Sequence, residues 1–300
     1  MFRSLIMIIK KLNKGLAIGV VCVCLLVAAS YADEARKHIA IAVFPCSDVV
    51  RSFTKFYPLI TYLKHETGFD IRLVVPKDFA EFERGVKHGD IDFAFQDPQM
   101  YVEIAGLYDK GSLIRSLTRE GTAFQSGVLI AAKDSSINKV EDLKGSVVMF
   151  GPRFSAARWA AAKLLFEEGG IDLDKDLKSY SNGGCCEDIA FNIYLKRVDA
   201  GVVCDHFLDE HSQKQEELGI ETEQIIVISR TRLVPTRVFG ARRNTSNNIV
   251  AKISQALLRL DKKNPEHAKA LYRAELGGFE KSKDEDYDDL RRLTGTKPMD

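Results

Sequence analysis

The sequence lacks the short motifs that identify most hydrolases, nucleotide-binding enzymes and thiol oxidoreductases. It contains no Ser-centred nucleophile motif, no glycine-rich phosphate loop and no Cys-x-x-Cys pair. The six histidines show neither metal-ligand nor catalytic spacing. These absences favour a binding protein over an enzyme, and we expect neither a metal nor another cofactor.

An excess of charge of one sign is also missing. The 43 Lys and Arg residues nearly balance the 42 Asp and Glu residues, for a formal net charge of +1. Nucleic-acid binding needs a basic surface, so this balance gives no reason to expect it. The length suggests two lobes, yet no stretch rich in Pro, Gly or Ser forms a linker. Two lobes that exchange strands would explain the missing linker.

The first 32 residues have the features of a secretory signal peptide. Four basic residues precede the apolar run Leu16–Ala29, and Ser30 and Ala32 supply small side chains for cleavage after Ala32. An uncleaved membrane anchor is the alternative, but a spanning helix needs about 20 apolar residues and this run is shorter. We therefore expect export to the periplasm and a mature chain with 39 basic and 42 acidic residues.

Short apolar runs alternate with helical patterns along the mature chain. This alternation is typical of an α/β protein with mainly parallel strands. Asp97 and Pro98 begin one helix, since Asp caps helix N-termini and proline is tolerated at the first helical position. We expect strands at 38–44, 70–76, 90–96, 147–150, 200–204 and 223–229, and helices at 49–68, 78–89, 97–106, 154–168, 187–198 and 206–218.

Six stretches together resemble one family, the phosphate/phosphite/phosphonate-binding (PhnD-type) periplasmic solute-binding proteins. In the family's order they are "FYPLITYLKHETGFDIRLVV", "FERGVKHGDIDFAFQDPQMYVEIAG", "INKVEDLKGSVVMFG", "RVDAGVV", "VPTRVFGAR" and "GFEKSKDEDYDDLRRL". The resemblance implies a two-lobed type II periplasmic binding protein with two strands crossing between the lobes and a small anion in the cleft. Lobe 1 then comprises 33–125 and 237–300, and lobe 2 comprises 126–236. The implied membrane partner is an ABC transporter permease or a sensor kinase.

The resemblance also implies where the ligand binds. Helix N-termini attract anions through unpaired N–H groups and a positive partial charge. The family's tyrosine is present as Tyr101, and its acidic cleft residue is present as Glu187. Asp205 stands where the family often has another polar cleft residue. Of the three hydroxyl residues that open the first helix of lobe 2, only Ser155 remains.

Two further family positions carry other residues. Phe79 keeps the ring of a tyrosine without its hydroxyl, so it would form an apolar wall, and Cys186 stands in place of a histidine. Arg153 and Arg158 flank the turn before the helix of lobe 2 and could contact an anion, although exposed arginines beside a helix start usually face solvent. These changes put phosphonate itself in doubt as the ligand but leave the fold unchanged.

Four cysteines remain in the mature chain, and the resemblance places them near the cleft: Cys46, Cys185, Cys186 and Cys204. In a structural interpretation, Cys185 or Cys186 forms a disulfide with Cys204. In a functional interpretation, one or more thiolates bind a soft ligand such as arsenite, for which Glu187 would favour a protonated species. A disulfide between the adjacent pair, acting as a redox switch, is a third interpretation.

We therefore expect a periplasmic solute-binding protein that captures a small oxyanion such as phosphonate, phosphite or phosphate. One alternative is a cysteine-based receptor for a soft metalloid such as arsenite. Another is a thiol redox protein on the same scaffold, although the missing Cys-x-x-Cys pair argues against it. A third is an extracytoplasmic module that no longer binds a ligand, which the loss of hydroxyl residues would suggest.

Overall fold

The computed structural model describes residues 38–44, 49–207, 219 and 221–297. The expected signal peptide, Cys46 and most of the expected helix 206–218 lie outside the described residues. By its internal contacts, the chain divides into Met1–Ile39 and Ala40–Asp300. All elements below belong to the second unit, apart from the first residue of β1.

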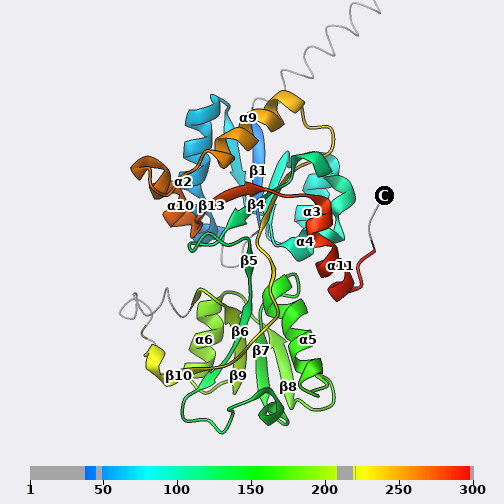
Figure 1. Cartoon of the computed structure of the whole chain (residues 1–300), viewed down its shortest axis with the longest axis vertical. Helices are drawn as coiled ribbons and strands as arrows, with labels where there is room; N and C mark the ends of the chain where they lie inside the picture. The colour runs from blue at the N-terminus through cyan, green and yellow to red at the C-terminus, as the bar shows by residue number, and fades with distance from the viewer. Residues whose placement is uncertain (1–37, 45–48, 208–218, 220, 298–300) are drawn as a thin grey trace, which may run out of the picture. The chain divides into compact units, whose positions relative to one another are not determined.

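The first sheet has six strands in the order β13-β4-β12-β3-β1-β2. Every residue of β1 is buried, as expected for a strand covered on both faces. Its strands are β1 (Ile39–Val43), β2 (Ile71–Val74), β3 (Phe93–Gln96), β4 (Ile114–Leu117), β12 (Val238–Ala241) and β13 (Gly278–Lys281). The associated helices are α2 (Val49–Thr67), α3 (Phe79–His88), α4 (Pro98–Glu103), α9 (Asn247–Leu258), α10 (Pro265–Ala274) and α11 (Asp288–Thr294), most of which are labelled in Figure 1.

The second sheet has five strands in the order β10-β6-β9-β7-β8. Val128 and Ile130 of β6 pack in a cluster with α6, whereas Leu129 and Ala131 pack in a cluster that includes Ala162 and Phe166 of α5. Helices α5 and α6 therefore cover opposite faces of this sheet (Figure 1). The elements are β6 (Gly127–Ala132), β7 (Val147–Phe150), β8 (Ser179–Asn182), β9 (Ala200–Cys204), β10 (Ile225–Arg230), α5 (Ala161–Glu168) and α6 (Cys186–Tyr194).

The expectation of mainly parallel strands is wrong. β1 pairs in parallel with β3, and β7 pairs in parallel with β8 and β9. However, β12 is antiparallel to β3 and β4, β13 is antiparallel to β4, and β6 is antiparallel to β9 and β10. The physical reason is the path of the chain, which leaves the first sheet after β4 and returns to its interior as β12 from the opposite direction.

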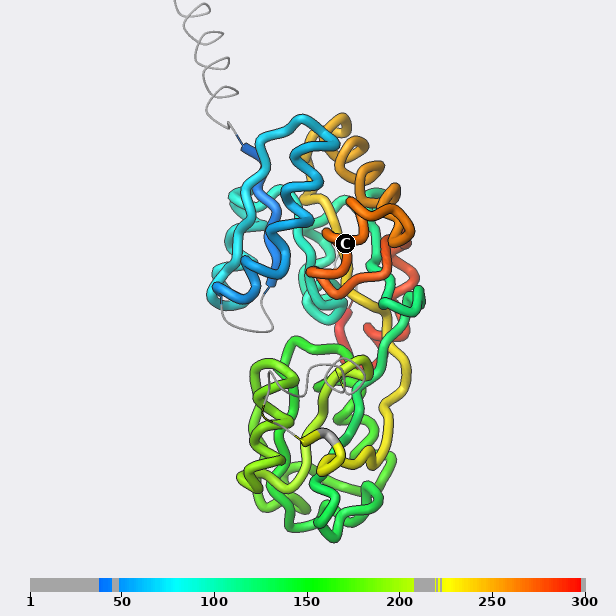
Figure 2. The backbone as a smooth tube through the Cα atoms, turned by 90° about the vertical axis from the view of Figure 1, so that its left-hand side faces the viewer, coloured from blue at the N-terminus to red at the C-terminus, as the bar shows by residue number. Residues whose placement is uncertain are grey.

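A short pair of strands links the two sheets. β5 (Phe124–Gln125) and β11 (Val234–Pro235) are antiparallel, with Val234 opposite Gln125. The two connecting segments run side by side, the first green and the second yellow (Figures 1 and 2). The strands of the five-stranded sheet all lie between them in sequence. The exact lobe boundaries, 125/126 and 236/237, stay a prediction.

Within the part of the chain that the structure describes, no helix is long and apolar enough to cross a membrane.

Candidate ligand-binding site

A cavity of about 440 Å³ is lined by elements that belong to both sheets. This volume lies in the range of small-molecule sites. Its lining carries more cations than anions, because six basic residues face three carboxylates, so the pocket is suited to a negatively charged ligand. The basic residues are Arg51, Lys55, Arg119, Arg158, Arg237 and Arg273, and the carboxylates are Asp97, Glu187 and Glu275.

Arg158 reaches the pocket from the turn after β7. Ser155 caps the helical segment Ala156–Ala160, a π-helix that precedes α5, and its side chain accepts a 3.3 Å hydrogen bond from the backbone N–H of Arg158. Only 2% of Arg158 is exposed, and its Nη1 donates to the carbonyl oxygen of Gly184 at 3.1 Å. The expectation that Arg158 faces solvent is therefore wrong. A Cβ at Gly151 would lie 2.5 Å from the Cβ of Arg158 and 3.1 Å from its guanidinium carbon, so this glycine leaves room for the arginine to turn inward.

Arg237 lies between β11 and β12, in the second connecting segment. Its guanidinium carbon lies 5.8 Å from the ring centre of Phe95 and 6.0 Å from that of Phe56. Cation–π contacts of this kind hold a charged group beside apolar walls. The backbone carbonyl of Arg237 accepts a 2.9 Å hydrogen bond from Ser116, which fixes the segment to β4. The pocket is thus lined by arginines from both connected halves of the fold.

Asp97 forms the polar link between these halves. As the cap of α4, its Oδ1 accepts hydrogen bonds of 2.9 Å from the backbone N–H groups of Gln99 and Ala156. Burial raises the pKa of Asp97 to about 6, although these two hydrogen bonds and the charges of Arg237 and Arg158 oppose the rise. The Asp97 carboxylate therefore already accepts the backbone N–H of Ala156, at the start of the helical segment where the family resemblance would place the ligand.

The raised pKa of Asp97 predicts a pH-dependent stability. Between about pH 4 and 6 the folded state binds a proton at Asp97 that the unfolded chain releases, so the free energy of unfolding should fall as pH rises through this window. Relative to Asp97→Asn, the free energy of unfolding of the wild type should fall by about 2 kcal/mol between pH 4 and 7. This figure is smaller than the full pKa shift would give, because the half-buried side chain keeps some contact with water. Urea unfolding measures this difference. Asp78→Asn, at the exposed cap of α3, controls for an amide in a cap position. A difference that does not change with pH contradicts the assignment.

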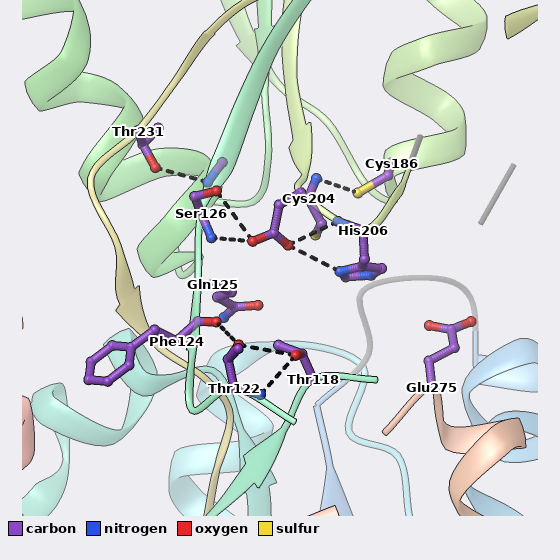
Figure 3. A network of polar contacts seen from close by, with 12 residues as sticks. Thr118, Thr122, Phe124, Gln125, Ser126, Cys186, Cys204, His206, Thr231 and Glu275 are labelled. Atoms are coloured by element: carbon purple, nitrogen blue, oxygen red, sulfur yellow. Dashed lines mark hydrogen bonds and ion pairs between the residues drawn. The ribbon is translucent and has the colours of Figure 1, made fainter. Parts of the chain in front are cut away.

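The three described cysteines are free thiols. Cys185 caps α6, and its Sγ lies 3.2 Å from Oδ2 of Asp188. Cys186 begins α6, and its Sγ accepts a hydrogen bond of 3.1 Å from the backbone N–H of Cys204 (Figure 3). Cys185, Cys186 and Cys204 therefore form no disulfide with one another in this structure. All three residues line the pocket.

The structure brings together only some of the predicted site residues. Ser155, Cys186 and Glu187 line the pocket. Asp205 is not part of the lining, but its carboxylate accepts a 2.7 Å hydrogen bond from the backbone N–H of Ser126 and a 2.9 Å bond from that of His206, which does line the pocket. Asp205 thus holds the backbone of His206, and ligand contact by Asp205 stays a prediction.

Tyr101 and Phe79 lie elsewhere. Tyr101 is fully buried, and its hydroxyl donates to Oδ1 of Asp284 at 2.7 Å. Phe79 stacks on Phe154 with ring centres 4.3 Å apart. Neither residue lines the pocket, and ligand contacts by them stay a prediction.

Sequence reasoning missed Arg237 and misjudged Arg158. Arg237 belongs to the stretch "VPTRVFGAR", which carried the family resemblance without pointing to a charge in the site. For Arg158, the available signal was Gly151, since a glycine in the turn after β7 lets a side chain pack against the backbone. Among the residues that the structure describes, no group of three or more His, Cys, Asp or Glu side chains is arranged to hold a metal ion.

Comparison with known proteins places the chain in a family. The family profile described as "ABC transporter, phosphonate, periplasmic substrate-binding protein" matches residues 41–287. The phosphate-import protein PhnD of Mycolicibacterium smegmatis is 25% identical over 261 residues, which cover 79% of each chain. The phosphonates-binding periplasmic protein of Escherichia coli is 22% identical over 279 residues, or 91% of this chain and 81% of that protein.

Solved structures of low sequence identity share the fold. A binding protein component of an ABC phosphonate transporter from Pseudomonas aeruginosa has a TM-score of 0.75 at 20% identity, covering 86% of this chain and 85% of that one. PhnD1 from Prochlorococcus marinus, solved in complex with methylphosphonate, has a TM-score of 0.75 at 14% identity, covering 86% and 97%. The expected fold class, a type II periplasmic binding protein, is confirmed. The chain belongs to the family of periplasmic substrate-binding proteins of phosphonate ABC transporters.

Proposed function

We propose that this protein captures a small phosphorus oxyanion, such as phosphonate, phosphite or phosphate, in the pocket between Arg158 and Arg237. The excess of basic over acidic residues in the lining carries this proposal. Two relatives support the ligand class, since one is named for phosphate import and another was solved with methylphosphonate. The protein itself is proposed to bind without catalysing a reaction.

The two arginines compensate for the hydroxyl residues that the chain lacks. A guanidinium presents a planar fork of N–H donors that matches the oxygens of a phosphonate or phosphate group. Arg158 is buried and its guanidinium is oriented by the carbonyl oxygen of Gly184, while Arg237 is held over two aromatic rings. Both charges are therefore positioned before the ligand arrives, which lowers the entropic cost of binding.

The proposed biological setting follows from the family. Export to the periplasm with cleavage after Ala32 would release the mature chain. The permease of an ABC transporter is then its membrane partner, because the family serves such transporters. A sensor kinase is the alternative partner.

A thermal-shift panel on the mature, reduced protein tests the proposed ligand class. The panel contains methylphosphonate, phosphite, phosphate, arsenate and arsenite, with chloride at equal ionic strength as the control. A ligand present at about 100 times its Kd should add about 2.7 kcal/mol to the free energy of unfolding. We expect a shift with at least one phosphorus oxyanion. If none of the three shifts the transition at millimolar concentration, the proposed function is wrong.

A second candidate function has one observation in its favour. The Cys186 thiol accepts a hydrogen bond from the backbone N–H of Cys204, and both cysteines line the pocket. Thiolates are preferred ligands of soft metalloids. A receptor for arsenite would show a shift with arsenite alone. That shift would disappear in Cys186→Ser and persist in Cys185→Ser, because the Cys185 thiol contacts Asp188 instead of Cys204.

A further inference from the structure

Two thiols meet where helix α6 begins and strand β9 ends. The Sγ of Cys186 accepts a hydrogen bond of 3.1 Å from the backbone N–H of Cys204 (Figure 3). Cys186 is 9% exposed and Cys204 is half-buried, and both line the pocket. The two cysteines are therefore neighbours in the wall of the space that a ligand would enter.

The thiol pair lies among positive charges. The hydrogen bond from Cys186, together with Arg158, His206 and Arg237, lowers the pKa of Cys204 well below its usual range. The same hydrogen bond and burial raise the pKa of Cys186. These opposite shifts favour a negative charge on the Cys204 sulfur over one on the Cys186 sulfur. A thiolate in electropositive surroundings is the reactive form of cysteine.

We propose that Cys186 and Cys204 form a thiol–disulfide exchange site, and that their oxidation to a disulfide raises the affinity of the pocket for oxyanions. The affinity part rests on the proposed oxyanion function, whereas the exchange chemistry does not. The co-reactant is a disulfide, either a small molecule or an oxidoreductase.

The exchange takes two steps. The Cys204 thiolate attacks one sulfur of a disulfide R–S–S–R, which forms a mixed disulfide and releases RS⁻. The Cys186 sulfur, on losing its proton to that leaving thiolate, attacks the Cys204 sulfur and displaces the second RS⁻. This thiolate takes a proton from water. Two cysteine thiols are thus oxidised, and the co-reactant is reduced to two thiols.

The effect on affinity follows from the charge that oxidation removes. In the reduced state the thiolate shares Arg158 and Arg237 with any bound oxyanion, and two anions that face the same cations repel each other. The disulfide is neutral, so oxidation removes this repulsion while the positive charges of both guanidinium groups remain. We expect methylphosphonate or phosphate to bind the oxidised protein about tenfold more tightly, which corresponds to about 1.4 kcal/mol.

Cys185 provides a matched control in the same turn. It is 7% exposed, and its Sγ contacts Asp188 rather than a second thiol. Burial, together with a hydrogen bond to Glu187, raises its pKa to about 12, so its thiol is protonated at neutral pH. It should therefore not act as a nucleophile toward a disulfide.

The experiment uses the mature chain with Cys46→Ser, so that Cys185, Cys186 and Cys204 are the remaining thiols. Samples are treated with oxidised glutathione or with a reducing phosphine. Alkylation and peptide mass spectrometry locate the disulfide, and calorimetry measures the affinity for methylphosphonate and phosphate. We expect a Cys186–Cys204 link and a tenfold gain in affinity. Cys185→Ser should keep both effects, whereas Cys186→Ser and Cys204→Ser should show neither.

The mapped disulfide and the measured affinity together show which part of the proposal is wrong. If no Cys186–Cys204 link forms in a folded protein, the exchange site is wrong. If the link forms and the affinity stays equal or decreases, the electrostatic coupling is wrong. If the link forms and neither anion binds in either state, the oxyanion function fails, and the coupling fails with it.

Discussion

Replacing Arg158 by glutamine should weaken binding of the oxyanion by about thirtyfold, or about 2 kcal/mol. The guanidinium is almost fully buried and lines the pocket, so no nearby water replaces the lost charge efficiently. Calorimetry with the strongest ligand of the panel measures the change. Arg153→Gln is the matched control, because Arg153 is exposed and lies 4.7 Å from the ring centre of Trp159, away from the pocket lining.

A second variant separates the loss of a ligand contact from damage to the turn around Arg158. Because Arg158 also donates to Gly184, its loss affects the turn as well as the ligand. Arg237→Gln removes the other guanidinium from a different segment and should produce a loss of similar size. Thermal unfolding of both variants without ligand shows whether they are folded. Unchanged affinity in two folded variants would contradict the assignment of the arginines to the ligand.

Replacing Asp284 by alanine should lower the free energy of unfolding by about 3 kcal/mol. Asp284 accepts hydrogen bonds from Tyr101 at 2.7 Å and from Arg291, and Lys110 lies 3.0 Å away. Only 5% of the Arg291 side chain is exposed, so its charge would lose a buried partner. Chemical denaturation measures the loss. Asp289→Ala is the control and should change the free energy by under about 0.5 kcal/mol, since its ion pair with Arg292 is exposed.

The same network should contribute to acid sensitivity. Burial raises the pKa of Asp284, but hydrogen bonds from Tyr101, Arg291 and Lys110 outweigh this effect and leave the pKa lowered. A group with a lowered pKa in the folded state stabilises the protein at neutral pH, and this contribution is lost as pH falls below about 4. Asp284→Ala should therefore differ least from wild type under acid conditions.

Local sequence signals were sufficient for most elements. Asp97 and Pro98 start α4 as expected, and the expected strands at 147–150 and 200–204 match β7 and β9. These elements follow from caps and apolar runs within a few residues of each other. The strand directions did not follow in the same way, because the return of β12 depends on a path of more than a hundred residues.

The candidate site was less predictable, because it depends on which way side chains turn. The sequence identified Ser155, Cys186 and Glu187, which lie at or beside helix starts and line the pocket. It did not show that Arg158 is buried, since the space for this side chain beside Gly151 exists only in the folded turn. It also did not show that Asp284, within an apparently charged tail, bonds to Tyr101 and that Tyr101 is turned away from the pocket lining.

Arg158 and Arg237 hold the ligand in the proposed site, while the Asp97 carboxylate keeps the backbone N–H of Ala156. A crystal structure of the protein with the ligand that shifts the thermal transition most tests this arrangement. We expect oxyanion oxygens about 3 Å from the guanidinium nitrogens of Arg158 and Arg237. An oxyanion bound instead at the backbone N–H of Ala156, with Asp97 displaced and neither arginine in contact, would contradict it.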